Sequence, residues 1–195
     1  SDWLPGGGLY VQINATDDQD GRPPLSDFLS GVLNDMRGRR IPLAVVDLRF
    51  NTGGNAANII EFTKALPEAL PSDAPIYIVT SGDTFSAGII AAARLKHFGG
   101  ERAHVVGEQI GDREAFWAEG QDFVLPNSRL LIKSTAAFHD WKHGCTIFQI
   151  GYCYLFNYLW NAPAGDLSPT TPAPQSFGDY AAGRDSVLKA IGIAE

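Results

Sequence analysis

Short apolar runs alternate with helical stretches along the first half of the chain. The runs are rich in β-branched residues and predict buried strands at residues 9–13, 43–50, 76–79 and 104–106. Apolar residues at helical spacing, or runs of strong helix formers, predict helices at residues 26–36, 56–70 and 87–95. Such alternation is typical of an α/β fold, in which helices cover a sheet.

The pattern is less regular after residue 111. Aromatic and aliphatic residues predict two strands at 116–120 and 123–128, linked by a turn and continuing through 130–133. Residues 161–178 are rich in proline and threonine and predict an extended segment. Residues 180–193 have apolar positions on one face and predict a final helix.

Size and composition favour one globular domain. The chain has 195 residues, 45% of them hydrophobic and 19% charged, which is enough for a large core. We therefore expect residues 1–195 to form a single domain. Three consecutive glycines at residues 6–8 predict a flexible entry over residues 1–8.

Charge and residue types exclude several function classes. The net charge of −7 argues against nucleic acid or an anionic membrane as a partner. No apolar run approaches the ~20 residues that span a bilayer, so we expect no membrane span. Two cysteines and four scattered histidines make no convincing ligand set, so we expect no metal and no cofactor.

Ser86 lies where the strand at 76–79 gives way to the helix at 87–95. Backbone N–H groups at a helix start are unpaired and favour negative charge. A hydroxyl placed there can attack a carbonyl, and the N–H groups can hold the resulting oxyanion. The alternative is that Asp83, Thr84 or Ser86 simply caps the helix.

A second turn of this kind follows the strand at 43–50. Gly53 and Gly54 stand between that strand and the helix at 56–70. Paired glycines let the backbone approach a ligand closely, so an oxyanion-holding N–H group fits here. The alternative is an ordinary strand-to-helix turn.

Three segments in this order resemble the tail-specific (C-terminal-processing) serine peptidases of the Clp-protease/crotonase superfamily. Residues 47–55 are similar to the family's Asp-Leu-Arg-x-Asn-x-Gly-Gly signature. Residues 84–87 look like its nucleophile segment, with Ser86 at the nucleophile position. Residues 105–108, followed by Gly111, look like its Val-Gly-Glu-x-x-x-Gly strand and turn.

The resemblance covers roughly residues 9 to 135 and implies a spiral of strand–helix repeats. It further implies that Ser86 attacks an amide carbonyl of a peptide or protein substrate. The oxyanion hole would come from backbone N–H groups of Gly53, Gly54 and Ala87. The separate PDZ-like domain that many processing peptidases carry is not seen in this sequence.

The chain departs from the family at the catalytic base. The processing peptidases have a lysine after the glycine of the third motif, but here Asp112 and Arg113 follow Gly111. An aspartate is a poor base unless burial raises its pKa, so Asp112 is a tentative base. A structural ion pair with Arg113 is the alternative.

His139 is the other tentative base. It follows the strand-like residues 130–133 and precedes Asp140, and an unperturbed imidazole has a pKa of about 6.5. The tricorn-like relatives use histidine and glutamate, with the histidine upstream of the Gly-Gly strand, in a segment that this chain does not supply. A histidine in a loop without a catalytic role is the alternative.

Cys145 and Cys153 bound a short loop and predict a disulfide, which indicates an exported protein. Export is also common in the family that the chain resembles. Two buried free thiols are the alternative. The aromatic segment 149–160 could face an apolar peptide or another subunit, so a homo-oligomer is possible.

Two hypotheses for the function follow. The first is a serine hydrolase, most naturally a peptidase, that forms an acyl-enzyme at Ser86. The second is a non-catalytic relative that binds a peptide or ligand in the inherited cleft. The absent lysine favours the second, whereas the retained Ser86 and paired glycines favour the first.

Overall fold

The protein is described by a computed structural model that covers residues 1–149 and 151–193. Its centre is a six-stranded sheet in the order β1-β2-β3-β4-β5-β10. All neighbouring strands are parallel except β1, which pairs antiparallel with β2. The strands are β1 (Asp2–Trp3), β2 (Leu9–Gln12), β3 (Ala44–Asp47), β4 (Ile76–Thr80), β5 (Ala103–Gly107) and β10 (Thr171–Pro172).

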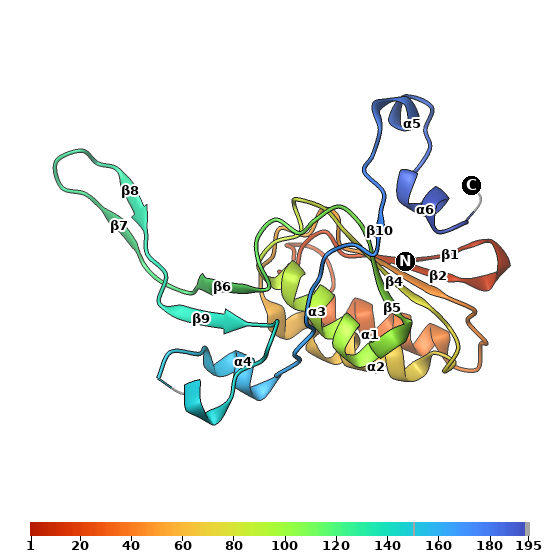
Figure 1. Cartoon of the computed structure of the whole chain (residues 1–195), viewed down its shortest axis with the longest axis horizontal. Helices are drawn as coiled ribbons and strands as arrows, with labels where there is room; N and C mark the ends of the chain where they lie inside the picture. The colour runs from red at the N-terminus through yellow and green to blue at the C-terminus, as the bar shows by residue number, and fades with distance from the viewer. Residues whose placement is uncertain (150, 194–195) are drawn as a thin grey trace.

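Three helices lie along one face of the sheet (Figure 1). They are α1 (Leu25–Met36), α2 (Ile60–Ala69) and α3 (Ala87–Gly99). Short 3-10 helices join the elements at Pro5–Gly7, Ala56–Ile59, Gly100–Arg102 and Ile147–Gln149. Because side chains alternate along a strand, Val46 and Ile78 reach the core beneath these helices, while Val45 and Val79 reach the opposite face.

The α/β fold predicted from the sequence is confirmed. Strands β2 to β5 are adjacent in the sheet in their chain order, and each is followed by a crossover. Because α1, α2 and α3 all cover one face, the repeats coil in a single direction, as the resemblance implies. The strand-to-helix turns after β3 and β4 therefore lie side by side at the carboxyl ends of these two parallel strands.

Both ends of the chain differ from the sequence-based expectation. Residues 1–8, predicted as a flexible entry, contain β1, which turns back through Gly6 and Gly7 to pair with β2. The predicted helix at 180–193 is instead two short helices, α5 (Phe177–Ala181) and α6 (Ser186–Ala190). Gly183, with φ 69°, ends the first helix, and Asp185 caps the second.

The segment predicted as extended, 161–178, contains β10, whose Thr171 and Pro172 pair with β5 at the edge of the sheet. Proline is tolerated at a sheet edge because its missing N–H costs no ladder hydrogen bond there. Helix α5 begins at Phe177, within the range predicted as extended.

A long ribbon leaves the body between β5 and β10. The strands predicted at 116–120 and 123–128 do not pair with each other. Instead β6 (Ala115–Ala118) pairs with β9 (Ala137–Asp140), and β7 (Asp122–Val124) pairs with β8 (Leu131–Lys133). The reversal falls later than expected because the turn forms at residues 126–129, a proline followed by three polar residues, where Leu125 and Leu130 close it with a backbone hydrogen bond.

The predicted disulfide is present between Cys145 and Cys153. The loop that it closes leads into α4 (Leu155–Leu159). Backbone hydrogen bonds from Phe138 to Tyr152 and from Tyr154 to Phe138 join this segment to β9. The buried Arg94 of α3 donates to the carbonyl of Trp160 and so ties the segment to the helical layer.

No helix in the described ranges is both long and apolar enough to cross a bilayer.

Candidate active site

Ser86 adopts a strained backbone conformation. Its φ of 50° and ψ of −119° lie outside the regions that an L-residue ordinarily occupies, which costs on the order of 1–3 kcal/mol. Its side chain makes no cap hydrogen bond to α3, so the simple helix-cap interpretation fails for this residue. Thr84, in contrast, is fully buried and accepts a hydrogen bond from the N–H of Ser81, which fixes the turn.

The paired glycines lie directly against Ser86. Gly53 has φ 108°, and a Cβ added there would lie 2.7 Å from the Cβ of Ser86. Only glycine therefore allows this close approach. The Gly53 N–H is already engaged, since it donates to Oδ1 of Asn51 at 3.0 Å.

Two other backbone N–H groups at this turn are free. Within the described residues, neither Gly54 nor Ala87 has an acceptor for its N–H group. Ala87 is the first residue of α3, where the helix dipole favours negative charge. Of the three predicted oxyanion-hole residues, Gly54 and Ala87 therefore keep available donors, whereas Gly53 shapes the turn.

A cavity of about 170 Å³ opens in front of Ser86. Its walls come from four parts of the chain. These are the turn with Gly53 and Gly54, the start of α3, the residues around the β6–β9 pair, and the segment after β9 that contains the disulfide. The lining residues are Gly54, Asn55, Ala56, Ser86, Ala87, Ile90, Phe116, Glu119, His139, Tyr154 and Phe156.

His139 is brought to the same cavity as Ser86, although 53 positions separate them in the chain. The side chain is 2% exposed, and its ring stacks on Phe116 with centroids 4.9 Å apart and planes 8° apart. Neither ring nitrogen has a hydrogen-bond partner among the described residues. Burial lowers the pKa of His139 to about 4, so the imidazole is neutral at neutral pH.

The carboxylate nearest His139 is Glu119, not the adjacent Asp140. Oε1 of Glu119 lies 3.7 Å from Nε2 of His139, which is beyond hydrogen-bond distance. Asp140 instead accepts hydrogen bonds from the N–H groups of Lys142 and His143. Ser86 and Glu119 both line the cavity and both have positive φ, although neither is glycine.

Asp112, the other tentative base, is not brought to Ser86. It is exposed, does not line the cavity, and accepts a hydrogen bond from the N–H of Arg113 at 2.8 Å. The side chains of Asp112 and Arg113 form no ion pair.

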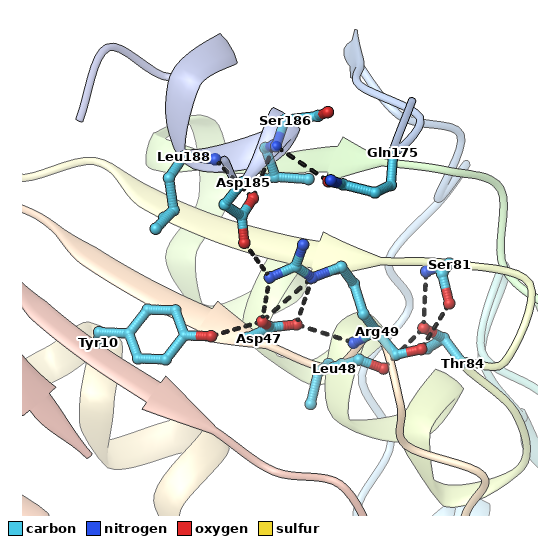
Figure 2. Close-up of polar contacts among 11 residues, drawn as sticks. Tyr10, Asp47, Leu48, Arg49, Ser81, Thr84, Gln175, Asp185, Ser186 and Leu188 are labelled. Carbon is cyan, nitrogen blue, oxygen red and sulfur yellow. Dashed lines mark hydrogen bonds and ion pairs between the residues drawn. The ribbon is translucent and has the colours of Figure 1, made fainter. Parts of the chain in front are cut away.

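Asp47 and Arg49, from the Asp-Leu-Arg part of the sequence signature, lie at the centre of a network of polar contacts (Figure 2). Arg49 holds the fully buried Asp47 through both carboxylate oxygens, and its Nη2 also lies 2.7 Å from Asp185 at the start of α6. Burial works against the charged guanidinium, but the hydrogen bonds that it donates to these carboxylates outweigh burial and raise the pKa of Arg49. Tyr10 donates to Asp47 at 2.6 Å.

This network fixes the strand end that leads into the paired glycines. Ser81 donates to the backbone carbonyl of Arg49 at 2.5 Å, and Thr84 donates to the carbonyl of Leu48 at 2.8 Å (Figure 2). The turns after β3 and β4 are thus bonded to each other, and this holds Ser86 against Gly53.

Solved structures share this arrangement of elements. A Parabacteroides merdae protein named as a peptidase candidate superposes with a TM-score of 0.58 at 16% identity, over 93% of this chain. A candidate S41 protease of Bacteroides fragilis superposes with a TM-score of 0.50 at 14% identity, over 89%. The likeness is one of fold. At these identities it shows neither a family nor a catalytic residue for this chain.

The chain spans 59% and 48% of the lengths of those two proteins. A scan of protein-family models finds no match to this chain, and no curated protein matches it either.

Glu119 is a cavity residue that the sequence did not reveal, and it reaches the cavity through the pairing of β6 with β9. Tyr154 and Phe156 belong to the aromatic segment 149–160, for which a peptide-facing surface was one expectation, but their place beside Ser86 was not foreseen. A carboxylate two residues after the aromatic pair Phe116 and Trp117 was the only local signal for Glu119, and it does not distinguish a site residue from a surface one.

Proposed function

We propose that this protein is a serine hydrolase that cleaves peptide bonds, with Ser86 as nucleophile and His139 as base. One observation carries the proposal: a single cavity is lined by a strained, uncapped serine and by a buried imidazole with no hydrogen-bond partner. Unsatisfied buried polar groups and positive φ at non-glycine residues both concentrate at functional sites.

In the proposed reaction the hydroxyl of Ser86 attacks the carbonyl carbon and His139 takes its proton. The oxyanion accepts hydrogen bonds from the N–H groups of Gly54 and Ala87. His139 then gives the proton to the departing amine, which leaves an ester at Ser86. Water, activated by the same imidazole, hydrolyses that ester and restores the free hydroxyl.

Glu119 is the proposed partner of His139 when the imidazole carries the proton. A buried imidazole with a pKa of about 4 accepts a proton poorly unless negative charge lies close to it. The carboxylate at 3.7 Å supplies that charge, and a shift of about 1 Å would complete the hydrogen bond. Catalytic hydrogen bonds commonly tighten only when substrate binds.

A binding function without catalysis is the second candidate. It is favoured by the absence of a hydrogen bond between the side chains of Ser86 and His139 in the described residues, and by the exposed position of Asp112 where relatives of this kind have a lysine. The same cavity would then hold a peptide or small ligand without cleaving it.

We propose export on the disulfide alone, since such bonds persist in oxidising compartments.

Covalent labelling with a fluorophosphonate, followed by intact-mass measurement, separates the two candidates. The hydrolase predicts one adduct on the wild type and none on Ser86→Ala. Ser128→Ala, which removes an exposed hydroxyl far along the ribbon, is the matched control and should label normally. His139→Phe should slow labelling by about 10² or more.

Absence of an adduct at every pH from mildly acidic to alkaline would reject catalysis for this chain and leave the binding function. Labelling of Ser86 that is unaffected by His139→Phe would keep the nucleophile but reject the proposed base.

A further inference from the structure

The ribbon ends in a hairpin whose apolar side chains are left in solvent. We call residues 122–133 the arm; it projects away from the rest of the molecule (Figure 1). Its large apolar side chains have exposed fractions between 40% and 61%, and they are Phe123, Val124, Leu125, Leu130, Leu131 and Ile132. A two-stranded hairpin is only marginally stable in water, so this one gains much from a partner that covers it.

A second apolar surface surrounds the disulfide. We call residues 144–149 and 151–160 the cap. Its exposed members are Ile147, Phe148, Tyr152, Leu155 and Leu159, and Phe148 is 90% exposed. The sequence from 144 to 165 contains no charged residue, although the whole chain has a net charge of −7. Aromatic enrichment with depletion of charge is the composition of a protein–protein interface core.

The two surfaces are connected through one strand. The arm leaves the body between β6 and β9, and the cap is hydrogen-bonded to β9 on both sides of Phe138. Both therefore lie at the same end of the molecule, away from α5 and α6 (Figure 1). A two-fold axis near that end would bring the arm of each copy to the cap of the other.

We propose that two copies of this chain associate by exchanging arms, each arm packing on the cap of the second copy. Such an interface is isologous and closes as a dimer, because arm contacts cap twice.

Area supports a stable contact. Cross-strand partners share a face, so Phe123 and Ile132 lie on the face opposite to Val124 and Leu131. The face of Phe123 and Ile132, with Leu125 and Leu130, exposes on the order of 350 Å² of apolar surface. Two such faces on two caps would bury on the order of 1,400 Å², which exceeds the ~1,200 Å² of the smallest stable interfaces.

The shape of the arm disfavours a membrane as the occupant. Its tip is the polar turn Asn127, Ser128 and Arg129, which would have to enter the bilayer first. The apolar residues lie along the sides of the hairpin, where a protein surface can cover them.

Formation of the dimer should also change the proposed active site, a consequence that rests on the proposed function. Tyr154 and Phe156 of the cap and Glu119 at the root of the arm line the cavity in front of Ser86. Fixing arm and cap in a dimer would hold Glu119 close to His139, so labelling of Ser86 should become faster as the dimer forms.

Sedimentation analysis over concentrations from nanomolar to tens of micromolar tests the association without reference to activity. The wild type should pass from monomer to dimer. An arm variant, Phe123→Ser with Leu130→Ser, and a cap variant, Phe148→Ser with Leu155→Ser, should each raise the dissociation constant at least tenfold. An equimolar mixture of the two variants keeps one intact arm–cap contact and should dimerise more tightly than either alone.

Phe177→Ser with Tyr180→Ser is the matched control. These side chains on α5 are 83% and 72% exposed but belong to neither surface, so the dissociation constant should not change. Circular dichroism of every variant should match the wild type, because all the substituted side chains are exposed.

A wild type that stays monomeric across the range would overturn the proposal, as would a dimer indifferent to the arm variant or an open series of polymers. A dimer with the expected mutational pattern but no labelling of Ser86 would uphold the association and reject the hydrolase.

Discussion

The buried imidazole of His139 should make the protein lose stability on mild acidification. In the unfolded chain this histidine has a pKa near 6.5, whereas burial lowers it to about 4 in the folded protein. Between those values the unfolded state binds a proton that the folded state does not. The free energy of unfolding therefore falls as pH decreases through this window.

The size of the effect follows from the same two values. The full difference corresponds to roughly 3 kcal/mol, lost at up to about 1.4 kcal/mol per pH unit between pH 6.5 and pH 4. This is a large share of the 5–15 kcal/mol that is typical of a domain.

Urea unfolding at a series of pH values, on the wild type and on His139→Phe, measures this contribution. Phenylalanine fits beside Phe116 and Tyr154 and cannot titrate, so the difference between the two proteins cancels the effects of other acidic groups. The wild type should lose roughly 3 kcal/mol more than the variant on going from pH 7 to below pH 4. Parallel curves, or an NMR-measured His139 pKa above 6, would show that the charge of Glu119 outweighs burial.

Three further changes test other parts of the structure by urea unfolding. Gly53→Ala should cost about 2–4 kcal/mol, since φ is 108° and the new Cβ would meet the site serine, whereas Gly82→Ala, in open space, should cost under ~0.5 kcal/mol. Arg49→Met leaves a buried carboxylate unpaired and should cost about 3–5 kcal/mol, while the exposed Arg40→Met should be near neutral. Cys145→Ser opens a short loop and should cost roughly 2–3 kcal/mol relative to the untreated wild type; equal stability of these two proteins would contradict the presence of the bond in solution.

The parallel sheet was predictable because its signals are local. Each of β2 to β5 is a short apolar run, and the helices between them have their own periodicity, so neighbouring residues suffice to identify them. The pairing of β6 with β9 was not predictable in this way. It joins residues about 20 positions apart, across an intervening hairpin, and no local pattern distinguishes it from the meander that the sequence favours.

The residues of the candidate site also fall into two groups, those that local patterns predict and those that only tertiary pairing brings to the cavity. Ser86 and the paired glycines lie at the ends of predictable strands, so the sequence placed them correctly next to each other. His139 was identified as a tentative base, but through its neighbour Asp140, which in the structure bonds to the following turn instead. Glu119 reaches the cavity only through tertiary pairing, and the exposure of Asp112 follows from a loop whose course no periodicity specifies.

The ion pair between Arg49 and Asp185 joins residues 136 positions apart, and this separation has a consequence for biosynthesis. A ribosome releases β3 and the paired-glycine turn long before it releases α6. Until then Arg49 lacks its contact with Asp185. The face of the sheet that carries Val45 and Val79 also stays uncovered, because Val187 of α6 packs there. We therefore expect the nascent chain to stay accessible to proteases and chaperones until residue 185 is made, since only then can Asp185 bind Arg49.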